Sequence, residues 1–380
     1  MEKFFTDLHI HIGSAGGGRP VKITASRSLT VDTVLKECLV NKGIDMVGIV
    51  DASSTLVQDD LLSLLELGNL RELPGGGLRY EEKVTLILGA EVETAENIHC
   101  LCYFPDFYSL QKFTMVMKGS GRIRNITLSS QRCGLSTQSI VETVQGLKGF
   151  VVPAHVFTPH KGMYGSRVRS ALEILSPEAW RQIPAVELGL SSDSYYADML
   201  SELSGKSFLS NSDAHSLQKI AREYNVITMA EPTFKELLMA LGREDGRAVS
   251  GNFGLDPRLG KYYRTFCDIC QAPAKGKPPV TSCLICGNGA VPVKVTMGVL
   301  DRIHLIRDCA SPVPPKHRPA YVHQIPLQNL PGIGPKTLAK LLKNHTEMEV
   351  LHSLAPGQIA ELTSEEVMAV IIEARQGQLM

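Results

Sequence analysis

The chain has 380 residues, of which 43% are hydrophobic and 21% charged, and its acidic and basic side chains balance to a formal net charge of zero. This length suggests two or three globular domains. The neutral balance excludes a nucleic-acid surface built from bulk basic charge, so such a surface must come from local clusters or motifs. The N-terminus lacks the regions of a signal peptide, and no apolar run reaches the roughly 18 residues of a membrane span. We therefore expect a cytosolic protein.

Residues 1 to about 250 alternate short apolar runs with amphipathic stretches. One amphipathic helix is predicted to begin after Thr30, which is a suitable N-cap, and others cover 140–147 and 234–241. The predicted strands are 47–50, 84–88, 98–104, 150–152, 185–190 and 208–210. Strands that alternate with helices indicate an α/β fold with a mostly parallel sheet or barrel.

Histidines and carboxylates recur at the ends of these predicted strands. His9 and His11 are two residues apart, so in a strand both imidazoles point to the same face. His99 lies inside a predicted strand, where a lone histidine is usually a satisfied core residue. The residues that follow apolar runs are Asp51, Glu91, His155, Asp213 and His215. Barrel folds assemble their active sites at such strand ends.

Imidazoles mixed with carboxylates suit Zn, Mn or Fe better than Mg or Ca. A bridging carboxylate can hold two ions about 3.5–4 Å apart, and such a pair activates a water and neutralises the oxygens of a phosphoryl transfer. The sequence therefore predicts a multinuclear metal site for phosphoester hydrolysis.

The ligand series resembles the PHP superfamily over roughly residues 3–250. The positions that match in order are His9, His11, Asp51, Glu91, His99, His155, Asp213 and His215. The resemblance implies a distorted (β/α)7 barrel. It also implies one ion on His9, His11, Glu91 and Asp213, a second on Glu91, His99 and His155, and His215 in a third site.

Two departures from the PHP pattern concern this third site. Ala52 and the run Gly16-Gly17-Gly18 stand where many PHP members carry histidines for the third ion. We therefore expect two divalent ions (Zn, Mn, Fe or Mg) and leave the third open. Asp213 is the first candidate for orienting the attacking water, and Asp51 and His11 are further candidate catalytic residues.

Four of the nine cysteines form two C-x-x-C pairs. They are Cys267, Cys270, Cys283 and Cys286. Four thiolates close a tetrahedral zinc site with no open position, so the predicted role is structural. Nearby Lys261, Arg264, Lys275 and Lys277 give local positive charge, which fits either DNA contact or a solvated face. The remaining cysteines, namely Cys38, Cys100, Cys102, Cys133 and Cys309, show no ligand spacing.

The C-terminal segment contains a second specific motif at 330–337. Pro335 fits the first position of a helix, and Gly334 precedes it as a cap. Gly332 and Gly334 let backbone N–H groups approach an anion, and Lys336 adds a positive charge. The motif resembles the helix-hairpin-helix of DNA-repair proteins, which grips the phosphate backbone without reading sequence. A helical hairpin that binds another protein is the alternative interpretation.

The predicted organisation is a PHP domain at 1–250, a zinc ribbon with linker at 251–318 and a helix-hairpin-helix domain at 319–380. This combination resembles the endonuclease Q family of DNA-repair nucleases. It implies a nick on the 5′ side of uracil, hypoxanthine, xanthine or an abasic site, in double- or single-stranded DNA, by a nucleoid-associated enzyme. Candidate DNA contacts outside the hairpin are Arg19, Lys22, Arg122 and Arg124, whose alternative reading is solvated surface loops.

Two other functions remain open at this stage. A small-molecule phosphatase of the histidinol-phosphate type would share the metal ligands but has no evident need for a ribbon and a hairpin. A non-catalytic DNA-binding scaffold would need only the C-terminal parts.

Overall fold

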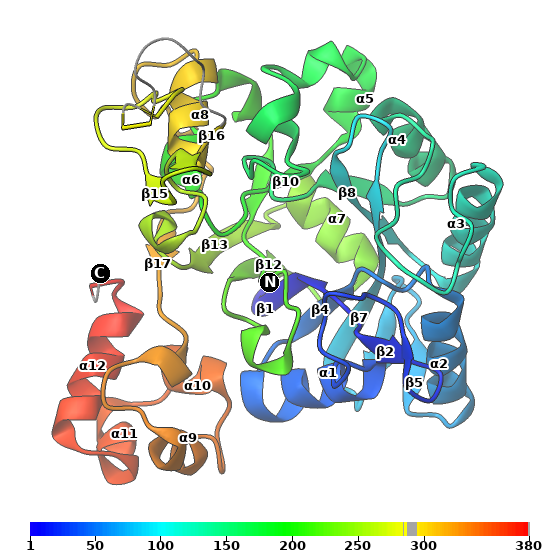
Figure 1. The fold of residues 1–380 in the computed structure, drawn as a ribbon. Coiled ribbons are helices and arrows are strands. Elements are labelled where there is room, and N and C mark those ends of the chain that lie inside the picture. The colour runs from blue at the N-terminus through cyan, green and yellow to red at the C-terminus, as the bar shows by residue number, and fades with distance from the viewer. Residues whose placement is uncertain (284, 287–294, 379–380) are drawn as a thin grey trace.

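The computed structural model describes residues 1–283, 285–286 and 295–378 (Figure 1). Its main sheet has ten strands in the order β17-β13-β12-β1-β4-β7-β6-β5, and β8 and β9 branch from β7. The strands are β1 Glu2–Ile10, β4 Met46–Ile49, β5 Leu70–Glu72, β6 Leu78–Tyr80, β7 Val84–Glu93, β8 His99–Phe104, β9 Phe150–Pro153, β12 Tyr224–Met229, β13 Ala248–Gly254 and β17 Tyr321–His323.

The sheet is mixed, so the expectation of a mostly parallel sheet is wrong. β1, β4 and β7 are parallel at its centre, whereas the pairs β1–β12, β12–β13, β7–β8 and β8–β9 are antiparallel. The long strand β7 explains the change of direction. Its first half, up to Leu88, pairs with β4, and its second half, up to Glu93, pairs with β8. β8 returns after a short turn, and a connection of that length joins only antiparallel strands.

A separate parallel pair completes the α/β body. It consists of β10 (Ala185–Glu187) and β11 (Ser207–Leu209). β10 lies beside β9, and β11 lies beside β13, so the strands follow one another around a common centre. The predicted α/β class is therefore confirmed. Among the strands that the structure describes, no hydrogen-bonded ladder joins this pair to the main sheet.

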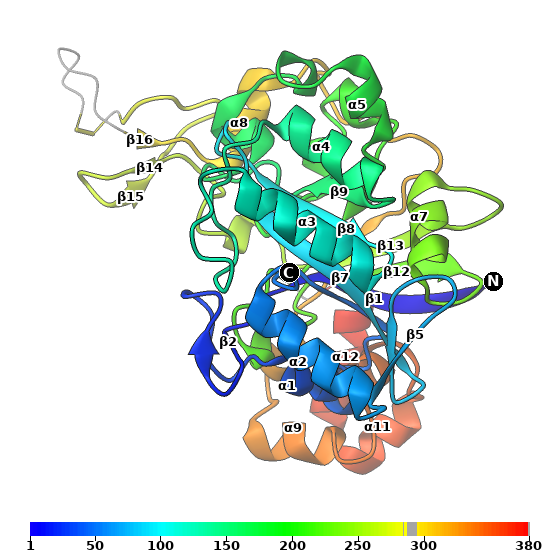
Figure 2. The same cartoon turned by 90° about the vertical axis from the view of Figure 1, so that its right-hand side faces the viewer.

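Helices cover the outside of these strands (Figure 2). They are α1 Val31–Glu37, α2 Thr55–Glu66, α3 Phe107–Gly119, α4 Thr137–Gly146, α5 Pro177–Gln182, α6 Ser194–Ala197 and α7 Phe234–Gly242. As predicted, Thr30 is the N-cap of α1, and its side chain accepts a hydrogen bond from Thr33 N. In the part of the chain described, no helix has the length and apolar character to cross a membrane.

A small sheet projects from the body on the same side as the hairpin of β2 (Ser14–Ala15) and β3 (Arg19–Pro20), as Figure 2 shows. Its strands are β14 Phe266–Cys267, β15 Ala272–Pro273 and β16 Val295–Thr296. The following helix, α8 (Val299–Ile306), ties this part to the body, because Arg302 donates to the carbonyl oxygens of Tyr164 and Val168, both at 2.8 Å.

Four short helices form the C-terminal part: α9 Pro335–Leu341, α10 Glu347–His352, α11 Pro356–Leu362 and α12 Glu365–Arg375. A buried ion pair docks them on the body, with Lys42 Nζ 2.6 Å from Glu347 Oε2. The chain reaches them through β17, which extends the main sheet beside β13. The predicted boundary at 318/319 thus falls before a strand of the main sheet, and the C-terminal helices contact the body through Glu347.

Candidate metal centre

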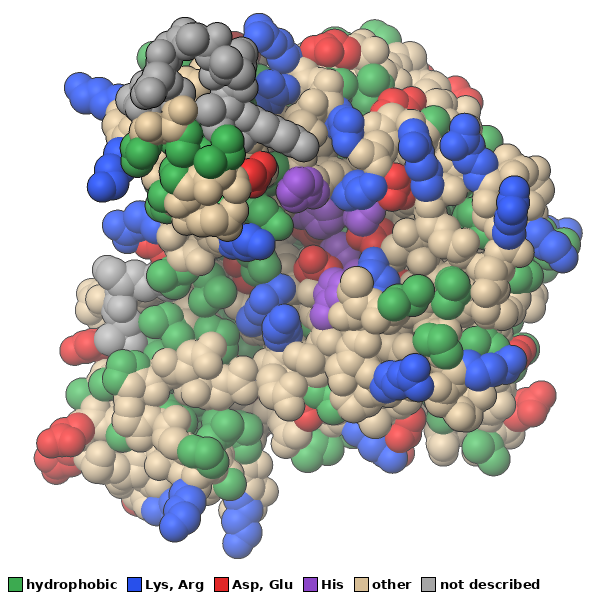
Figure 3. Space-filling view, viewed as in Figure 1, with side chains coloured by type: hydrophobic (Ala, Val, Ile, Leu, Met, Phe, Trp, Pro, Cys, Tyr) green, Lys and Arg blue, Asp and Glu red, His purple; other side chains and the backbone are tan. Residues whose placement is uncertain are grey.

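The predicted ligands form two groups inside the body. One group is His9, His11 and Asp213, and the other is Glu91, His99 and His155; within each group the potential ligand atoms all lie within 4.8 Å of one another. Figure 3 shows histidines gathered in a hollow on one face of the molecule, with lysines and arginines around it. Residues that are more than 200 positions apart in the sequence are thus brought to one place.

The end of β1 presents His9 and His11 to the same side, as their spacing predicts. Nε2 of His9 lies 3.5 Å and Nε2 of His11 lies 3.3 Å from Oδ1 of Asp213. These two nitrogens, and Nδ1 of His99, are buried without a hydrogen-bond partner. An orphaned buried polar atom costs about 1–3 kcal/mol. Imidazole nitrogens that face carboxylates at this spacing fit a divalent cation placed between them.

Glu91 connects the two groups. Its Oε1 lies 2.7 Å from Nδ1 of His99 and 3.9 Å from Nε2 of His155, while its Oε2 lies 3.7 Å from Nε2 of His11. The short contact with His99 lacks hydrogen-bond alignment, since Nδ1 of His99 stays unpaired. The sequence placed Glu91 beyond the strand 84–88, but it lies within β7. Pairing with β8 extends β7 and carries Glu91 to the centre.

Two further carboxylates stand behind the imidazoles. Both oxygens of Asp51 lie 3.1 Å from Nδ1 of His11, and Oδ2 also accepts a hydrogen bond from Ile12 N at 2.7 Å. Asp51 therefore contacts the back of His11, and this geometry favours a positioning role over the catalytic one that the sequence suggested. A carboxylate in this place fixes the tautomer and orientation of a ligating imidazole.

Glu187 does the same for His9 and was missed by sequence reasoning. Its Oε1 and Oε2 lie 3.0 and 3.1 Å from Nδ1 of His9, and Oε2 accepts a hydrogen bond from His155 N at 2.8 Å. One carboxylate thus orients a ligand of each group. The available signal was a charged residue inside the apolar run Ala185-Val186-Glu187 of a buried strand.

The electrostatics of the cluster favour bound cations. Burial alone would lower the pKa of His9, but the negative charges of Glu187, Asp213 and Glu91 raise it to about 10. Burial alone would raise the pKa of Glu91, but His99 and Lys22 hold it well below its usual range. The cluster therefore carries more carboxylate charge than neutral imidazoles can balance, and metal binding would replace the protons on the imidazoles.

Two ligands sit on strained backbone. Asp213 has a φ of 46° and His155 has a φ of 30°, which is the left-handed region that few non-glycine residues adopt. Gly189 allows His155 its place, because a Cβ at position 189 would come within 2.7 Å of the Cβ of His155. Strain of this kind gathers where surrounding structure fixes a functional side chain. The Asp213 side chain is 34% exposed, which makes it the open side of the first group.

His215 and Lys22 lie on the Oε2 side of the cluster. The His215 ring is 4.5 Å from the His11 ring, and its Nδ1 lies 3.0 Å from Asp213 O. His215 belongs to neither ligand group of the described residues. Lys22 was predicted to contact DNA or solvent, but its Nζ lies 2.8 Å from Oε2 of Glu91 and its side chain is 14% exposed. It is part of the centre.

The other predicted DNA contacts outside the hairpin, Arg19, Arg122 and Arg124, are exposed. Arg19 lies in β3, and Arg122 and Arg124 lie in the loop after α3. The segments 13–27 and 118–132 meet, because Ser129 N donates to Val21 O at 3.3 Å.

Gly332 has a φ of 79°, and Gly334 caps α9 with Pro335 at its first position, as predicted. Lys336 is exposed on that helix.

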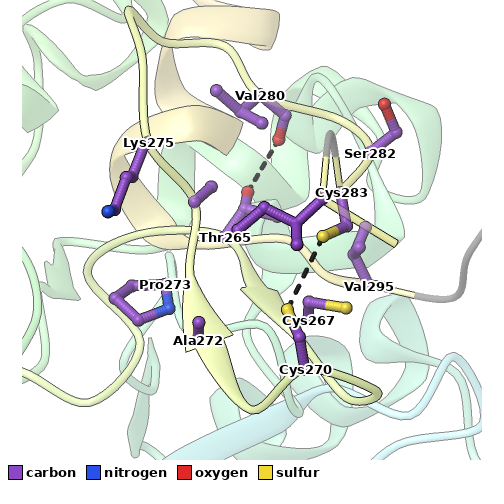
Figure 4. Close-up of a pocket in the computed structure, with 12 residues that line it drawn as sticks. Thr265, Cys267, Cys270, Ala272, Pro273, Lys275, Val280, Ser282, Cys283 and Val295 are labelled. Atoms are coloured by element: carbon purple, nitrogen blue, oxygen red, sulfur yellow. Dashed lines mark hydrogen bonds between the residues drawn. The ribbon is translucent and has the colours of Figure 1, made fainter. Parts of the chain in front are cut away.

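The four ribbon cysteines form one group; Figure 4 shows Cys267, Cys270 and Cys283, and Cys286 completes it. Their sulfurs lie 3.9 Å apart for Cys267 and Cys286 and 3.7 Å apart for Cys270 and Cys283, and all four fit around one ion. Backbone N–H groups lower the pKa of Cys283 to about 7, which favours its thiolate. Arg264 forms an ion pair with Asp301 at 3.1 Å, so its charge is already balanced within the protein.

A cavity of about 390 Å³ opens beside the metal ligands. His155, Asp213 and Glu187 form one wall of it. Lys261, Tyr262 and Arg222 line the rest together with backbone around Gly260, and sequence reasoning had picked none of them for a pocket. The Tyr262 ring meets the His160 ring edge-on at 5.4 Å. A volume of this size suits a small organic ligand.

Comparisons with known proteins agree with this architecture. Residues 196–245 match the family model described as PHP-associated. The uncharacterized protein YqxK of Bacillus subtilis is 44% identical over 100% of this chain and 96% of its own length. The crystal structure of the lesion-specific endonuclease PfuEndoQ from Pyrococcus furiosus superposes with a TM-score of 0.83 at 29% identity, covering 100% of this chain and 92% of that one. Endonuclease Q in complex with a 27-mer duplex carrying an abasic lesion at the active site gives a TM-score of 0.82 at 29% identity, with 100% and 93% covered.

Proposed function

The chain belongs to the family of endonuclease Q-like PHP proteins that includes YqxK, and on this premise we propose that it is a metal-dependent DNA-repair endonuclease. The proposed cut is the phosphodiester on the 5′ side of uracil, hypoxanthine, xanthine or an abasic site. One observation carries the proposal: a two-group metal-ligand cluster opens directly onto a cavity of nucleotide-binding size. A small-molecule phosphatase would need the cluster but neither the ribbon nor the C-terminal helices.

The side chains divide the work between holding and orienting. His9, His11 and Asp213 would hold one divalent ion, and Glu91, His99 and His155 a second. When bound, such a pair supplies an activated water and offsets charge on the phosphate. Asp213 is exposed toward the cavity, so its free oxygen is placed to orient the water. Glu187 and Asp51 keep Nε2 of His9 and His11 directed inward.

We assign the cavity to a nucleotide turned out of the helix. A damaged base costs less to unstack than a normal pair, and a flipped base is held by stacking and by hydrogen bonds to its edge. Tyr262 offers a ring face for stacking, and its position against His160 fixes that ring. Because Asp213 and His155 share this cavity with Tyr262, the backbone next to the flipped nucleotide would lie at the metal ligands.

The cationic lining gives a reason for binding a deaminated base better than the amino-bearing base from which it derives. Deamination replaces an amino group, which donates hydrogen bonds, by a carbonyl oxygen, which accepts them. Arg222 and Lys261 line the cavity and can only donate. A carbonyl oxygen directed at Arg222 and Lys261 would therefore find donors, while an amino group in the same place would face donors instead of the acceptors of the opposite wall, Asp213 and Glu187.

The test uses end-labelled duplexes with a single uracil, hypoxanthine, xanthine or abasic site, and an undamaged duplex of the same sequence, with Mg²⁺, Mn²⁺ or Zn²⁺. His9→Ala removes one ligand, and Asp213→Asn removes the charge of another. His317→Ala, at an exposed histidine far along the chain, is the matched control. We expect cutting just 5′ of each lesion by the wild type and by His317→Ala, and none by the two ligand variants.

A single-stranded version of each substrate shows whether the complementary strand is needed. Equal cutting of damaged and undamaged duplexes would remove lesion recognition from the proposal. Hydrolysis of a small phosphomonoester with no cut in any DNA would overturn it in favour of a phosphatase.

A further inference from the structure

The loop after β1 places a lysine inside the metal centre. Lys22 Nζ lies 2.8 Å from Oε2 of Glu91, the carboxylate that connects the two ligand groups. Its side chain is 14% exposed, although lysine is almost always an exposed residue. The ammonium group of Lys22 thus contacts the Glu91 carboxylate where a metal ion could otherwise bind.

Backbone hydrogen bonds hold the loop that carries Lys22 against the metal ligands. Lys22 N donates to Ile12 O at 2.9 Å, and Val21 N donates to Gly13 O at 3.1 Å. Ser26 N donates to His215 O at 2.8 Å, which ties the same loop to the Asp213–His215 segment. The loop therefore wraps around the centre and delivers one ammonium group to it.

Among the described residues, the side chains on that side form no further group that could hold an ion. His11 Nε2 and Lys22 Nζ share Oε2 of Glu91, at 3.7 and 2.8 Å. His215 lies next to His11 but belongs to neither group that can hold an ion in the described part of the chain. An ion bound to Oε2 of Glu91 on this side would meet the ammonium group at hydrogen-bond distance, and like charges at such a separation repel strongly.

The charges of the centre balance with two ions and Lys22. Four buried or half-buried carboxylates surround the imidazoles, those of Asp51, Glu91, Glu187 and Asp213. A fifth, Glu93, lies 4.0 Å from Nε2 of His99, but its charge is offset by Lys161 at 2.8 Å. Two divalent ions neutralise these four charges, and the ammonium group then leaves one positive charge for a phosphodiester. A third divalent ion in addition would leave an excess of positive charge, because Glu93, the further carboxylate near His99, is already paired with Lys161.

Resting on the proposed function, we propose that the ammonium group of Lys22 is a third cation of the centre supplied by the protein, so that the centre binds two divalent ions and no third. This accounts for the position of His215, which lies beside His11 without joining a ligand group. Replacing Lys22 with a carboxylate removes the competing cation and adds a ligand next to Glu91 and His215, so a third ion should then bind.

The experiment counts manganese in the full chain. Oxygen and nitrogen ligands accept Mn²⁺, whereas a four-thiolate site prefers zinc, so the ribbon ion is counted separately as zinc. Native mass spectrometry of the Mn²⁺-loaded wild type should give two manganese ions per chain. Lys22→Asp should give three, and Lys22→His is a second route to the same result. Lys219→Asp changes the net charge equally at an exposed site and should stay at two.

Three manganese ions in the wild type would overturn the assignment, and so would two in both Lys22 variants when they are folded as judged by circular dichroism. Cleavage of abasic DNA is measured on the same preparations. A wild type with two ions that cuts no DNA would count against the proposed function and leave the role of Lys22 intact.

Discussion

Glu187 directs both carboxylate oxygens at Nδ1 of His9, at 3.0 and 3.1 Å, across 178 residues of sequence. The same carboxylate accepts a hydrogen bond from His155 N at 2.8 Å and one from Asn211 Nδ2 at 2.8 Å. Nδ1 of His9 must therefore carry a proton, which leaves Nε2 as the atom that faces the ligand cluster. A single buried side chain thus orients the imidazole of His9 for an ion and holds the backbone of a second ligand, His155.

This relationship predicts that Glu187→Gln weakens metal binding while the fold is kept. The amide has the same shape, but it lacks the charge that stabilises His9. Loss of such a partner lowers metal affinity about 10–100-fold. Titration of the metal-free protein with Mn²⁺ measures it. Glu178→Gln, at an exposed position on α5, should bind as the wild type does. Unchanged Mn²⁺ affinity in Glu187→Gln would mean that Glu187 serves packing alone.

Tyr262 tests the assignment of the cavity. Stacking of a base on an aromatic ring contributes about 1–3 kcal/mol, so Tyr262→Ala should lower kcat/KM on lesion duplexes by roughly 5- to 150-fold. Tyr262→Phe keeps the ring face and should retain most activity. The manganese content should not change in either variant. Tyr195→Ala is the control, because Tyr195 is 59% exposed and does not line this cavity. Equal losses for Tyr262→Ala and Tyr195→Ala would remove the stacking role.

The half-buried imidazole of His352 leads us to expect that the protein loses folding stability at acidic pH. Burial lowers the pKa of His352 from 6.5 to about 4, with a smaller contribution from Arg375. Its ring packs 4.8 Å from the Phe5 ring, and its Nε2 lies 2.6 Å from the Tyr224 hydroxyl. Between these two pKa values the unfolded chain binds a proton that the folded protein does not, so stability falls as the pH drops below about 6.5.

Thermal or urea unfolding at pH 7.5 and pH 5.0 measures this effect. The wild type should lose roughly 1–2 kcal/mol more than His352→Gln over that interval. His345→Gln, a histidine change in the same C-terminal part, should keep the pH dependence of the wild type. Parallel curves for wild type and His352→Gln would show that this ring does not sense the pH.

The motif at 330–337 predicts a grip on DNA that is independent of damage. Lys336→Glu should weaken binding to lesion and undamaged duplexes by the same factor, because phosphate contacts carry no sequence information. The slope of log affinity against log salt should become shallower by about 1. Fluorescence anisotropy at several salt concentrations measures both. Lys235→Glu, at an exposed position on α7, should leave affinity and slope as they are. Unchanged binding in Lys336→Glu would favour the protein-binding alternative.

The sequence by itself determined the chemistry of the two metal-binding regions. Histidine, aspartate and glutamate identify themselves as ligands by type, and the period of a strand places His9 and His11 on one face without any tertiary information. In the same way, the spacing of the four cysteines was sufficient to predict that they form one metal site. The predicted α/β class follows from local hydrophobic periodicity, which also placed the cap of α1 at Thr30.

Only the tertiary structure decided which carboxylate does what. Asp51 and Glu187 both follow or end apolar strands, and nothing local distinguishes them from Glu91, yet they stand behind His11 and His9 while Glu91 connects the two ligand groups. The prediction of a mostly parallel sheet was wrong because the antiparallel pairing of β7 with β8 depends on where the chain turns, which local periodicity does not show. The partners of Lys22 and the lining of the cavity were equally invisible. Such roles arise from packing between elements far apart in sequence, which residue type and local period do not encode.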